Sequence, residues 1–251
     1  MTIEKMLKVS EIFYSIQGEG RMMGVPCVFI RLQACNLMCG GKGTEKDFKL
    51  HNGATWRCDT IEVWLKGKEY TPEDLLKKID KYEPFLQHGA HIVFTGGEPL
   101  LQQTGIKDFV MSYIQAHGYK PYVEIETNGT KMPIGAIETL TDLFICSPKL
   151  ENSGETKNRR IKGDVIKHLN NPNLETIFKF VVSKTIDFIE IRHDYLEPFK
   201  LEKEKVWLMP AAGTQEQIRK INAEIAGLCL LEGVNYSSRL QIQLWNETTG
   251  V

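Results

Sequence analysis

Long apolar runs and an excess of one charge are both missing from this sequence. Its 31 basic and 32 acidic residues give the 251-residue chain a formal net charge of −1, so no overall field attracts nucleic acid or an anionic membrane. No stretch is apolar over the length needed to cross a bilayer, and the first residues carry no secretory signal. We therefore expect a cytoplasmic protein whose partners include neither nucleic acid nor a membrane.

Cysteine pairs spaced as C-x2-C, which are common in zinc sites, are also absent. The chain has six cysteines, and because cytoplasmic thiols are kept reduced, we expect metal ligands or buried residues and no disulfides. Cys27, Cys146 and Cys229 stand among apolar neighbours and are predicted core residues. The remaining three follow the spacing C-x3-C-x18-C and are candidate ligands.

Sequence repeats, low-complexity tracts and domain linkers are missing as well, so we expect one domain over residues 1–251. The chain instead alternates short β-branched or aromatic runs with amphipathic segments, which is typical of parallel strands covered by helices. We predict an α/β fold with a barrel-like sheet. After an apolar segment at 8–16, strands are expected at 27–34, 91–95, 122–127, 142–147, 177–183, 205–209 and 239–245, and helices at 71–82, 106–118, 186–193 and 214–233.

Two segments carry clear local signals. Thr71 is a plausible N-cap, with Pro72 at the first helical position and Asp74 in the first turn, so a helix should begin there. The segment 150–164 is polar and charged, and we predict a mobile loop.

Polar or glycine-bearing motifs follow several of the expected strands. "CNLMC" follows 27–34, "GGEP" follows 91–95, "NGT" follows 122–127 and "SPK" follows 142–147. Because α/β folds gather their active-site loops at the carboxyl ends of the strands, these motifs predict a single site at one end of the sheet.

Cys35, Cys39 and Cys58 supply three thiolate ligands. Three thiolates can hold three irons of a four-iron cluster and leave the fourth iron open, whereas a structural zinc site normally takes four protein ligands. His51 and His91 are the nearby histidines that could complete a zinc site. From the residues alone, an iron–sulfur cluster, a zinc site and unrelated thiols all remain open.

The two ends of the cysteine loop resemble a known motif. "CNLMC" and "WRCDT" are similar to the halves of C-N-L-x-C-x-(aromatic)-C-D-T, the cluster loop of radical S-adenosylmethionine enzymes, with about sixteen residues inserted between them. The insertion does not forbid ligation, because loop-closure entropy grows only logarithmically with length. "FTGGEPLLQ" resembles the GGEP motif that receives the methionine amino group of the cofactor, and its glycines let the backbone approach a ligand closely.

Further motifs follow the order of one family of these enzymes. "FYSIQGEG", "GVPCVFIRLQACNL", "CDT", "ETNGT", "SPK", "FKFVV", "WLMPAAGT" and the terminal "LWNETTGV" resemble the 7-carboxy-7-deazaguanine synthases, from residue 7 to the C-terminus. The resemblance implies a radical S-adenosylmethionine core, a partial (open) TIM-like barrel of mostly parallel strands with helices outside, carrying an inserted cluster loop at about 40–57.

The same resemblance implies a lyase of queuosine and 7-deazapurine biosynthesis. A [4Fe-4S] cluster would cleave S-adenosylmethionine to a radical that abstracts hydrogen from C6 of 6-carboxy-5,6,7,8-tetrahydropterin. Ring contraction with loss of ammonia would then give 7-carboxy-7-deazaguanine. Mg²⁺, an electron donor such as flavodoxin and a homodimer are implied as well.

Carried over position by position, the resemblance also implies roles for individual residues. Cys35, Cys39 and Cys58 would ligate the cluster, Thr60 would bind Mg²⁺ with support from Asp59, and no acid–base residue is assigned. Arg31 would pair with the substrate carboxylate, which suits a planar, two-pronged donor. The cofactor would contact Gly96, Gly97, Glu98, Glu126, Asn128, Ser147, Pro148 and Lys149, and the pterin would contact Ile16, Gln17, Gly18, Glu19, Arg31, Thr95 and Val251.

The chain departs from the family pattern at its C-terminal end. Family members often carry a Q-x-H-K whose histidine approaches the substrate, but "RLQIQLWNETTGV" has no histidine, and Gln241 or Gln243 is the candidate replacement. The alternative reading for Asp59 and Thr60 is a helix or turn cap. A glycyl-radical activase is the alternative enzyme, although "QGEG" and "CDT" would not be expected in it, and a zinc-stabilised binding protein is the alternative outside enzymes.

Overall fold

The computed structural model describes residues 6–248 and residue 250, and the strands of this part of the chain form one nine-stranded sheet. Their order is β3-β1-β2-β4-β5-β6-β7-β8-β9. β1 pairs antiparallel with β2 and β3, and each pair from β2–β4 to β8–β9 is parallel. The predicted, mostly parallel α/β sheet is confirmed, and its two edge strands are β3 and β9.

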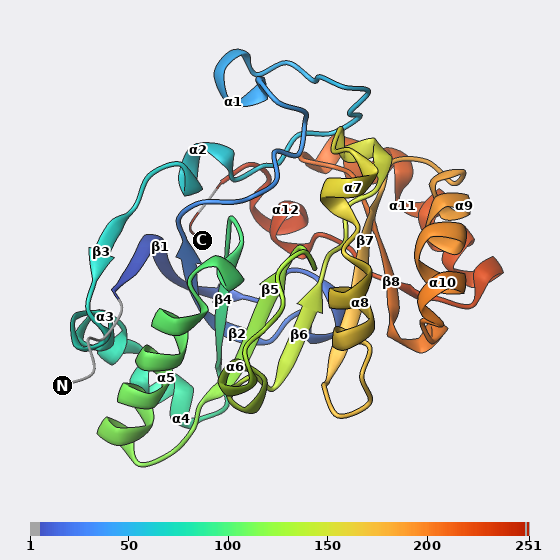
Figure 1. The fold of residues 1–251 in the computed structure, drawn as a ribbon. Coiled ribbons are helices and arrows are strands. Elements are labelled where there is room, and N and C mark those ends of the chain that lie inside the picture. The colour runs from blue at the N-terminus through green and yellow to red at the C-terminus, as the bar shows by residue number, and fades with distance from the viewer. Residues whose placement is uncertain (1–5, 249, 251) are drawn as a thin grey trace.

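Helices cover the outer face of this curved sheet (Figure 1). The strands are β1 (Leu7–Ile16), β2 (Pro26–Leu32), β3 (Lys68–Tyr70), β4 (His91–Gly96), β5 (Tyr122–Thr127), β6 (Leu143–Cys146), β7 (Thr176–Val182), β8 (Val206–Pro210) and β9 (Asn235–Tyr236). The helices are α1 (Thr44–Asp47), α2 (Ile61–Trp64), α3 (Pro72–Ile79), α4 (Glu83–Gln87), α5 (Gln103–His117), α6 (Gly135–Leu140), α7 (Lys157–Arg160), α8 (Gly163–Leu169), α9 (Asp187–Ile191), α10 (Glu197–Phe199), α11 (Gln215–Glu232) and α12 (Leu240–Trp245). Within the described residues, none of them has the length and apolarity needed to cross a membrane.

The two faces of each strand differ because successive side chains point to opposite sides. On β2, Val28 and Ile30 join the main core beneath the helices, whereas Cys27 and Phe29 belong to a separate, smaller cluster on the inner face. The inner face also carries buried polar side chains, namely His91, Thr95, Glu124 and Lys179. The concave side of the sheet is therefore polar enough to bind a ligand, while the convex side stabilises the fold.

Several local predictions are confirmed. The Thr71 hydroxyl accepts from the Asp74 backbone N–H at 3.1 Å and caps α3, with Pro72 in the first turn. The helices expected at 106–118 and 214–233 are α5 and α11, and the helix expected at 186–193 is α9 and the π-helical turn Arg192–Leu196. The three predicted core cysteines are all buried.

Two local predictions are wrong. The alternating residues of 239–245 predicted a strand, but α12 forms there, because the sheet has already ended at β9 and only Ile242 of that stretch is fully buried. The predicted loop at 150–164 instead forms a 3-10 turn (Glu151–Ser153), α7 and the start of α8. Its charged residues are used internally: Arg160 is buried and pairs with Glu190 at 2.7 Å.

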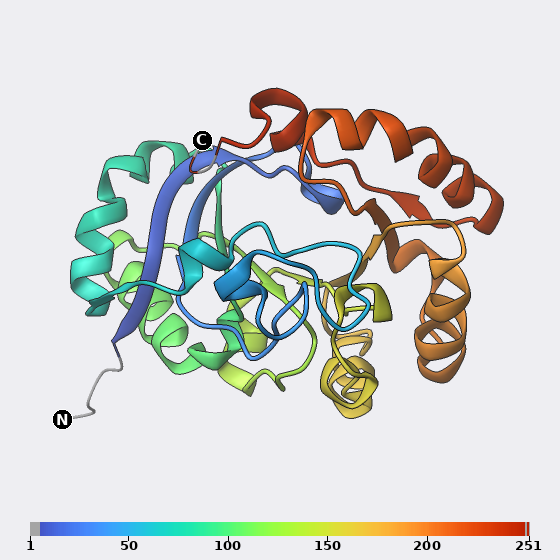
Figure 2. The ribbon, with the colours of Figure 1, turned by 90° about the horizontal axis from the view of Figure 1, so that it is seen from above.

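The insertion carries α1 and lies at one end of the sheet (Figure 1). Seen from above, the segment with α1 and α2 lies over the centre of the curved sheet (Figure 2). The insertion therefore stands at the same end as the motifs that follow β2, β4, β5 and β6.

Candidate active site

The four polar motifs meet at the carboxyl ends of β2, β4, β5 and β6. The N–H of Glu98 donates to the carbonyl of Ala34 at 2.9 Å, which joins the GGEP loop to the start of the cysteine loop. The N–H of Ser147 donates to the carbonyl of Thr127 at 2.7 Å, which joins the SPK and NGT loops. The structure therefore brings the predicted motifs together into one site.

The cysteine loop closes on itself despite its insertion. The Cys58 N–H donates to the Cys39 carbonyl at 3.1 Å, so the ends of the insertion meet. Within the loop, Arg57 donates from Nε to the Thr44 hydroxyl at 3.0 Å and also pairs with Glu62. The insertion is thus a folded lobe attached at its base.

The three loop thiols lie close enough to affect one another electrostatically. Burial is the main reason that the pKa of the Cys39 thiol is raised, and the nearby Cys58 and Cys35 add to it, while the Lys149 ammonium acts in the opposite direction. Burial also raises the pKa of the Cys35 thiol to about 11. A cationic iron centre would favour three thiolates at this position, so the donor set fits a cluster with one open iron.

The two glycines of the GGEP loop permit its close approach to the cysteine loop. A Cβ on Gly97 would lie 1.9 Å from the Ala34 carbonyl oxygen. Gly96 has φ +130°, and its Cβ would lie 2.3 Å from the Leu32 carbonyl oxygen. A side chain at Gly97 would push the GGEP loop away from the cysteine loop, and one at Gly96 would push it away from the end of β2.

Glu98 fixes the GGEP loop from inside the protein. Its side chain is fully buried and accepts three hydrogen bonds, from the Leu100 N–H at 3.0 Å, the Thr127 hydroxyl at 2.8 Å and the Asn128 N–H at 2.7 Å. These donors offset part of the cost of burying the group, although burial still raises the pKa of Glu98. Its carboxylate therefore positions the loop.

The other residues predicted to contact the cofactor lie next to the cysteines. Asn128 donates from Nδ2 to the Asn36 side chain at 3.0 Å and contacts the Cys35 sulfur at 3.8 Å. Lys149 donates to the Ser147 hydroxyl at 2.9 Å, and its Nζ lies 5.9 Å from the centre of the Trp56 ring. Pro148 between them is buried.

Gln17, Thr95 and Glu126 form one hydrogen-bonded group on the inner face of the sheet. Gln17 is buried and donates from Nε2 to Glu126 at 3.3 Å and to Glu124 at 3.1 Å. The Thr95 hydroxyl donates to the other oxygen of Glu126 at 2.6 Å. Two predicted pterin residues and one predicted cofactor residue are therefore in direct contact.

Glu19 is held by cations that the sequence analysis missed. Lys179 donates to one carboxylate oxygen at 2.5 Å, and Arg239 donates from Nε to the other at 3.0 Å. Burial alone would raise the pKa of Glu19, but the charges of Lys179 and Arg239 outweigh it and hold that pKa well below its usual range. The lysine inside the apolar "FKFVV", Lys179, could have indicated a buried charged site. Arg239 could not be placed at the site, because its segment was predicted to be a strand.

Gln241 contacts this group, and Gln243 does not. Gln241 donates from Nε2 to Glu19 at 2.8 Å, and a Cβ on Gly18 would lie 1.9 Å from its Oε1. That Oε1 is buried without a hydrogen-bond partner. Gln243 instead donates to the Ser238 hydroxyl at 2.8 Å. Of the two candidates for the missing histidine, Gln241 is the one that lies at the site.

The other predicted residues contact side chains of their own surroundings. Arg31 donates from Nε to Glu11 at 3.0 Å, and Ile16 ends β1 opposite Pro26. Thr60 precedes α2, but its hydroxyl makes no capping hydrogen bond and lies 3.4 Å from the Cys58 sulfur. Asp59 pairs with Arg239. Val251 lies outside the described residues.

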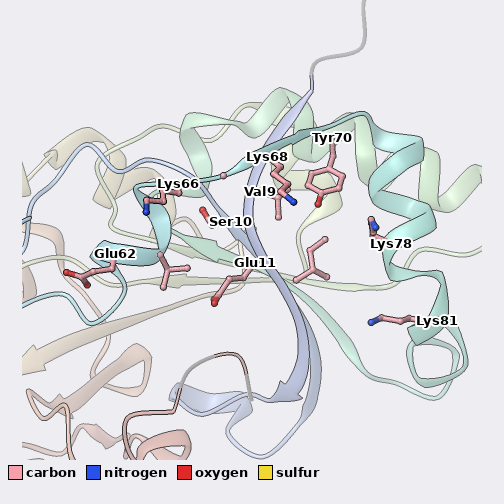
Figure 3. Close-up of a pocket in the computed structure, with 12 residues that line it drawn as sticks. Val9, Ser10, Glu11, Glu62, Lys66, Lys68, Tyr70, Lys78 and Lys81 are labelled. Carbon is pink, nitrogen blue, oxygen red and sulfur yellow. The ribbon is translucent and has the colours of Figure 1, made fainter.

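A groove lies apart from these loops, at the β3 edge of the sheet. It has a volume of about 600 Å³ and lies between β1, α2, β3 and the helical segment from α3 to Lys81. Figure 3 shows Lys66 and Glu62 at one end and Lys78 and Lys81 at the other. Glu11, which binds Arg31, lines it as well, so the groove borders the site without containing the cysteines or the glycine pair.

Comparison with known proteins finds relatives that align with this chain over most of the length of both proteins. A scan against models of protein families finds no match. The chain is 31% identical over 262 residues to the 7-carboxy-7-deazaguanine synthase of Halobacterium salinarum, covering 96% of this chain and 91% of that protein. It is 32% identical to that of Rhodopirellula baltica, over 98% and 90% of the two chains, and 30% identical to that of Pyrobaculum aerophilum over 100% of both.

The fold is similar to a solved structure. The crystal structure of QueE from Escherichia coli superposes with a TM-score of 0.59 over 94% of both chains, at 23% sequence identity. This likeness confirms the open α/β architecture.

Proposed function

The chain belongs to the 7-carboxy-7-deazaguanine synthase family of radical S-adenosylmethionine enzymes, and on that premise we propose that it converts 6-carboxy-5,6,7,8-tetrahydropterin to 7-carboxy-7-deazaguanine with loss of ammonia. The observation that carries the proposal is the convergence of Cys35, Cys39 and Cys58 beside the Gly96–Gly97 pair. A redox cluster and a cofactor that binds its open iron need this proximity.

The chain's own residues would hold the cofactors. The three cysteines would ligate a [4Fe-4S] cluster, and the Gly96–Gly97 backbone would receive the methionine end of S-adenosylmethionine, with Glu126, Asn128, Ser147, Pro148 and Lys149 around it. When bound, the cluster and S-adenosylmethionine supply the radical that abstracts hydrogen from C6 of the pterin. Glu98 would keep the glycine loop against Ala34, since its carboxylate ties this loop to Asn128.

Hydrogen-bonding groups of the concave face would orient the pterin. Gln17, Glu19 and Thr95 offer the donors and acceptors that an aminopyrimidinone ring needs, and Gln241 adds an unused buried acceptor. Arg31 gives its Nε to Glu11, which leaves the terminal amino groups for the substrate carboxylate. Unchanged activity in an Arg31→Ala variant would contradict the proposed pairing of Arg31 with the substrate carboxylate.

Mg²⁺, the electron donor and the oligomer belong to the same proposal. Thr60 would bind Mg²⁺ together with substrate oxygens and water, which is a common arrangement for this ion. Its hydroxyl is not used as a helix cap, which supports this role. A homodimer and a flavodoxin-type donor are inferred from the family resemblance, and a cytoplasmic location remains the expectation from the sequence.

Anaerobic reconstitution followed by turnover tests the proposal. We expect about four irons per chain and conversion of 6-carboxytetrahydropterin to a product with the mass of the deazapurine. Cys58→Ala should lose iron and activity, whereas Cys229→Ala, which alters a buried cysteine of α11, should keep both.

The same assay separates the alternatives. Cleavage of S-adenosylmethionine without the deazapurine would indicate another radical reaction, as in an activase. Stable zinc at the loop cysteines with no cofactor cleavage would support a zinc-stabilised binding protein. It would overturn the proposal that the chain is a radical S-adenosylmethionine enzyme.

A further inference from the structure

A second set of metal-ligand side chains lies on the inner face of the sheet, away from the loop cysteines. Cys27 is the second residue of β2, His91 the first of β4 and Glu124 the third of β5, so all three stand near the amino ends of neighbouring strands. Cys27 and His91 are partners in the parallel register. The catalytic loops leave the opposite ends of these strands.

The three side chains are tightly grouped and buried. The Cys27 sulfur, a ring nitrogen of His91 and a carboxylate oxygen of Glu124 all lie within 4.8 Å of one another. Cys27 and Glu124 are fully buried, and His91 is 7% exposed. Among the described residues, no other three His, Cys, Asp or Glu side chains bring their ligand atoms this close together.

From this geometry we infer that Cys27, His91 and Glu124 bind one zinc ion. Thiolate, imidazole and carboxylate are the ligands that zinc prefers, with bonds of about 2.0–2.3 Å and tetrahedral geometry. Ligand atoms in such a site are about 3.3–3.7 Å apart. His91 Nδ1 and the Glu124 oxygen, now 2.5 Å apart, would separate by roughly 1 Å, and a water would complete the tetrahedron.

The charges of the group favour a dication. Glu124 is a fully buried carboxylate whose partners are His91 and the neutral Gln17 amide. The Cys27 sulfhydryl donates to the Val25 carbonyl at 3.3 Å, and no cation in the described part of the chain pairs with it. Zn²⁺ would neutralise a thiolate and a carboxylate together, which reduces the penalty of burying them.

Neighbouring side chains hold the Glu124 carboxylate and the His91 ring in place. Gln17 donates to the Glu124 oxygen that is not in contact with His91, at 3.1 Å, and so orients the carboxylate. The Tyr122 ring stacks on the His91 ring with 3.9 Å between centroids. Because Gln17 also donates to Glu126, zinc at this position would fix a residue of the proposed pterin pocket, and this consequence rests on the proposed function.

Metal binding to the full-length chain tests the inference. The variant Cys35→Ser/Cys39→Ser/Cys58→Ser removes the loop thiols, and its fold is checked by far-ultraviolet circular dichroism. Titrated with Zn²⁺ against a chromophoric chelator, it should still bind one zinc per chain. Co²⁺ in its place should give a near-ultraviolet thiolate-to-cobalt charge-transfer band.

Substitutions within the group should abolish this binding. Added to the triple variant, Cys27→Ser should remove the cobalt band. His91→Gln should weaken zinc binding by more than the roughly 10–100-fold that follows the loss of a residue that only orients a ligand. Cys146→Ser is the matched control, because it alters another fully buried strand cysteine and should change neither readout.

The same prediction holds for the iron-loaded enzyme. Elemental analysis should find one zinc per chain in addition to iron, and this zinc should be missing from Cys27→Ser. Absence of zinc from both preparations, or binding unchanged by Cys27→Ser and His91→Gln, would overturn the inference. Neither readout needs turnover, so a missing zinc leaves the proposed lyase intact, and a bound zinc in an inactive enzyme leaves the zinc site intact.

Discussion

The backbone N–H of Cys58 donates to the carbonyl of Cys39 at 3.1 Å, although eighteen residues separate them in the sequence. This bond closes the base of the insertion, so the backbone of the third cysteine lies beside that of the second. The lobe is also tied to the cofactor side: Gly40 donates to the Ser153 carbonyl and Thr55 to the Asn152 carbonyl, both at 2.9 Å. The insertion thus supports the loop that follows β6.

Trp56 should stabilise that loop. Its indole N–H donates to the Asn152 side-chain oxygen at 2.8 Å, so Trp56→Phe should lower the free energy of unfolding by about 1–3 kcal/mol, because a partly buried acceptor loses its donor. The dissociation constant for S-adenosylmethionine should rise, since Asn152 follows Lys149 in the same loop. Chemical denaturation and equilibrium binding measure the two effects.

Trp207→Phe is the control for the loss of ring size. The Trp207 indole N–H is buried without a hydrogen-bond partner, so its removal deletes no hydrogen bond. Equal destabilisation by the two substitutions would contradict the role assigned to the Trp56 hydrogen bond.

Glu19 should make a pH-dependent contribution to stability. Its pKa in the folded protein is held below the unfolded value, so the contribution is complete above the unfolded pKa of about 4.3 and is lost progressively as the pH falls below it. Glu19→Gln should destabilise the cluster-free chain by roughly 3–5 kcal/mol at pH 7, because the buried Lys179 loses its ion-pair partner and Arg239 keeps only Asp59.

Denaturant unfolding of the wild-type chain and Glu19→Gln measures this difference between pH 7 and about pH 3. The gap between the two proteins should narrow at the acidic end. A gap that stays constant over this range would show that the Glu19 charge does not stabilise the fold.

Gln241 should contribute to substrate binding. Gln241→Met keeps the side-chain length but removes the buried amide acceptor and the donor to Glu19, so the KM for the pterin should rise about 10-fold or more. Gln241→His, which restores the residue type expected from the family pattern, should recover part of the loss. Gln243→Ala is the matched control and should leave KM within about 2-fold, since Gln243 contacts Ser238. Similar effects at both glutamines would argue against the assignment.

Gly97 should not tolerate a side chain. In Gly97→Ala the new methyl would meet the Ala34 carbonyl oxygen at 1.9 Å, which backbone atoms cannot relieve without separating the GGEP and cysteine loops. We expect loss of S-adenosylmethionine cleavage, measured as 5′-deoxyadenosine, and a chain that remains folded.

Gly227→Ala is the opposite case and serves as the control. Gly227 lies within α11 and a Cβ there meets nothing within 4 Å, so alanine should stabilise the chain by about 0.5–1 kcal/mol and leave activity unchanged. Full cofactor cleavage by Gly97→Ala would mean that the two loops need not be in contact.

The sequence by itself determined the features that depend on neighbouring residues. Alternation of strand and helix patterns gave the parallel sheet, Thr71 and Pro72 marked the start of α3, and the spacing of motifs after strands indicated one site. These predictions succeed because backbone preferences and side-chain alternation act over a few residues.

The tertiary structure decided what depends on distant segments. Residues 239–245 have a strand pattern, yet they form α12 because the sheet ends at β9, and only this placement brings Arg239 and Gln241 to Glu19. Likewise, only the register between β2, β4 and β5 groups Cys27 with His91 and Glu124, residues 64 and 33 positions apart. Contacts of this kind follow from how strands pair and where the sheet stops, which no short stretch of sequence encodes.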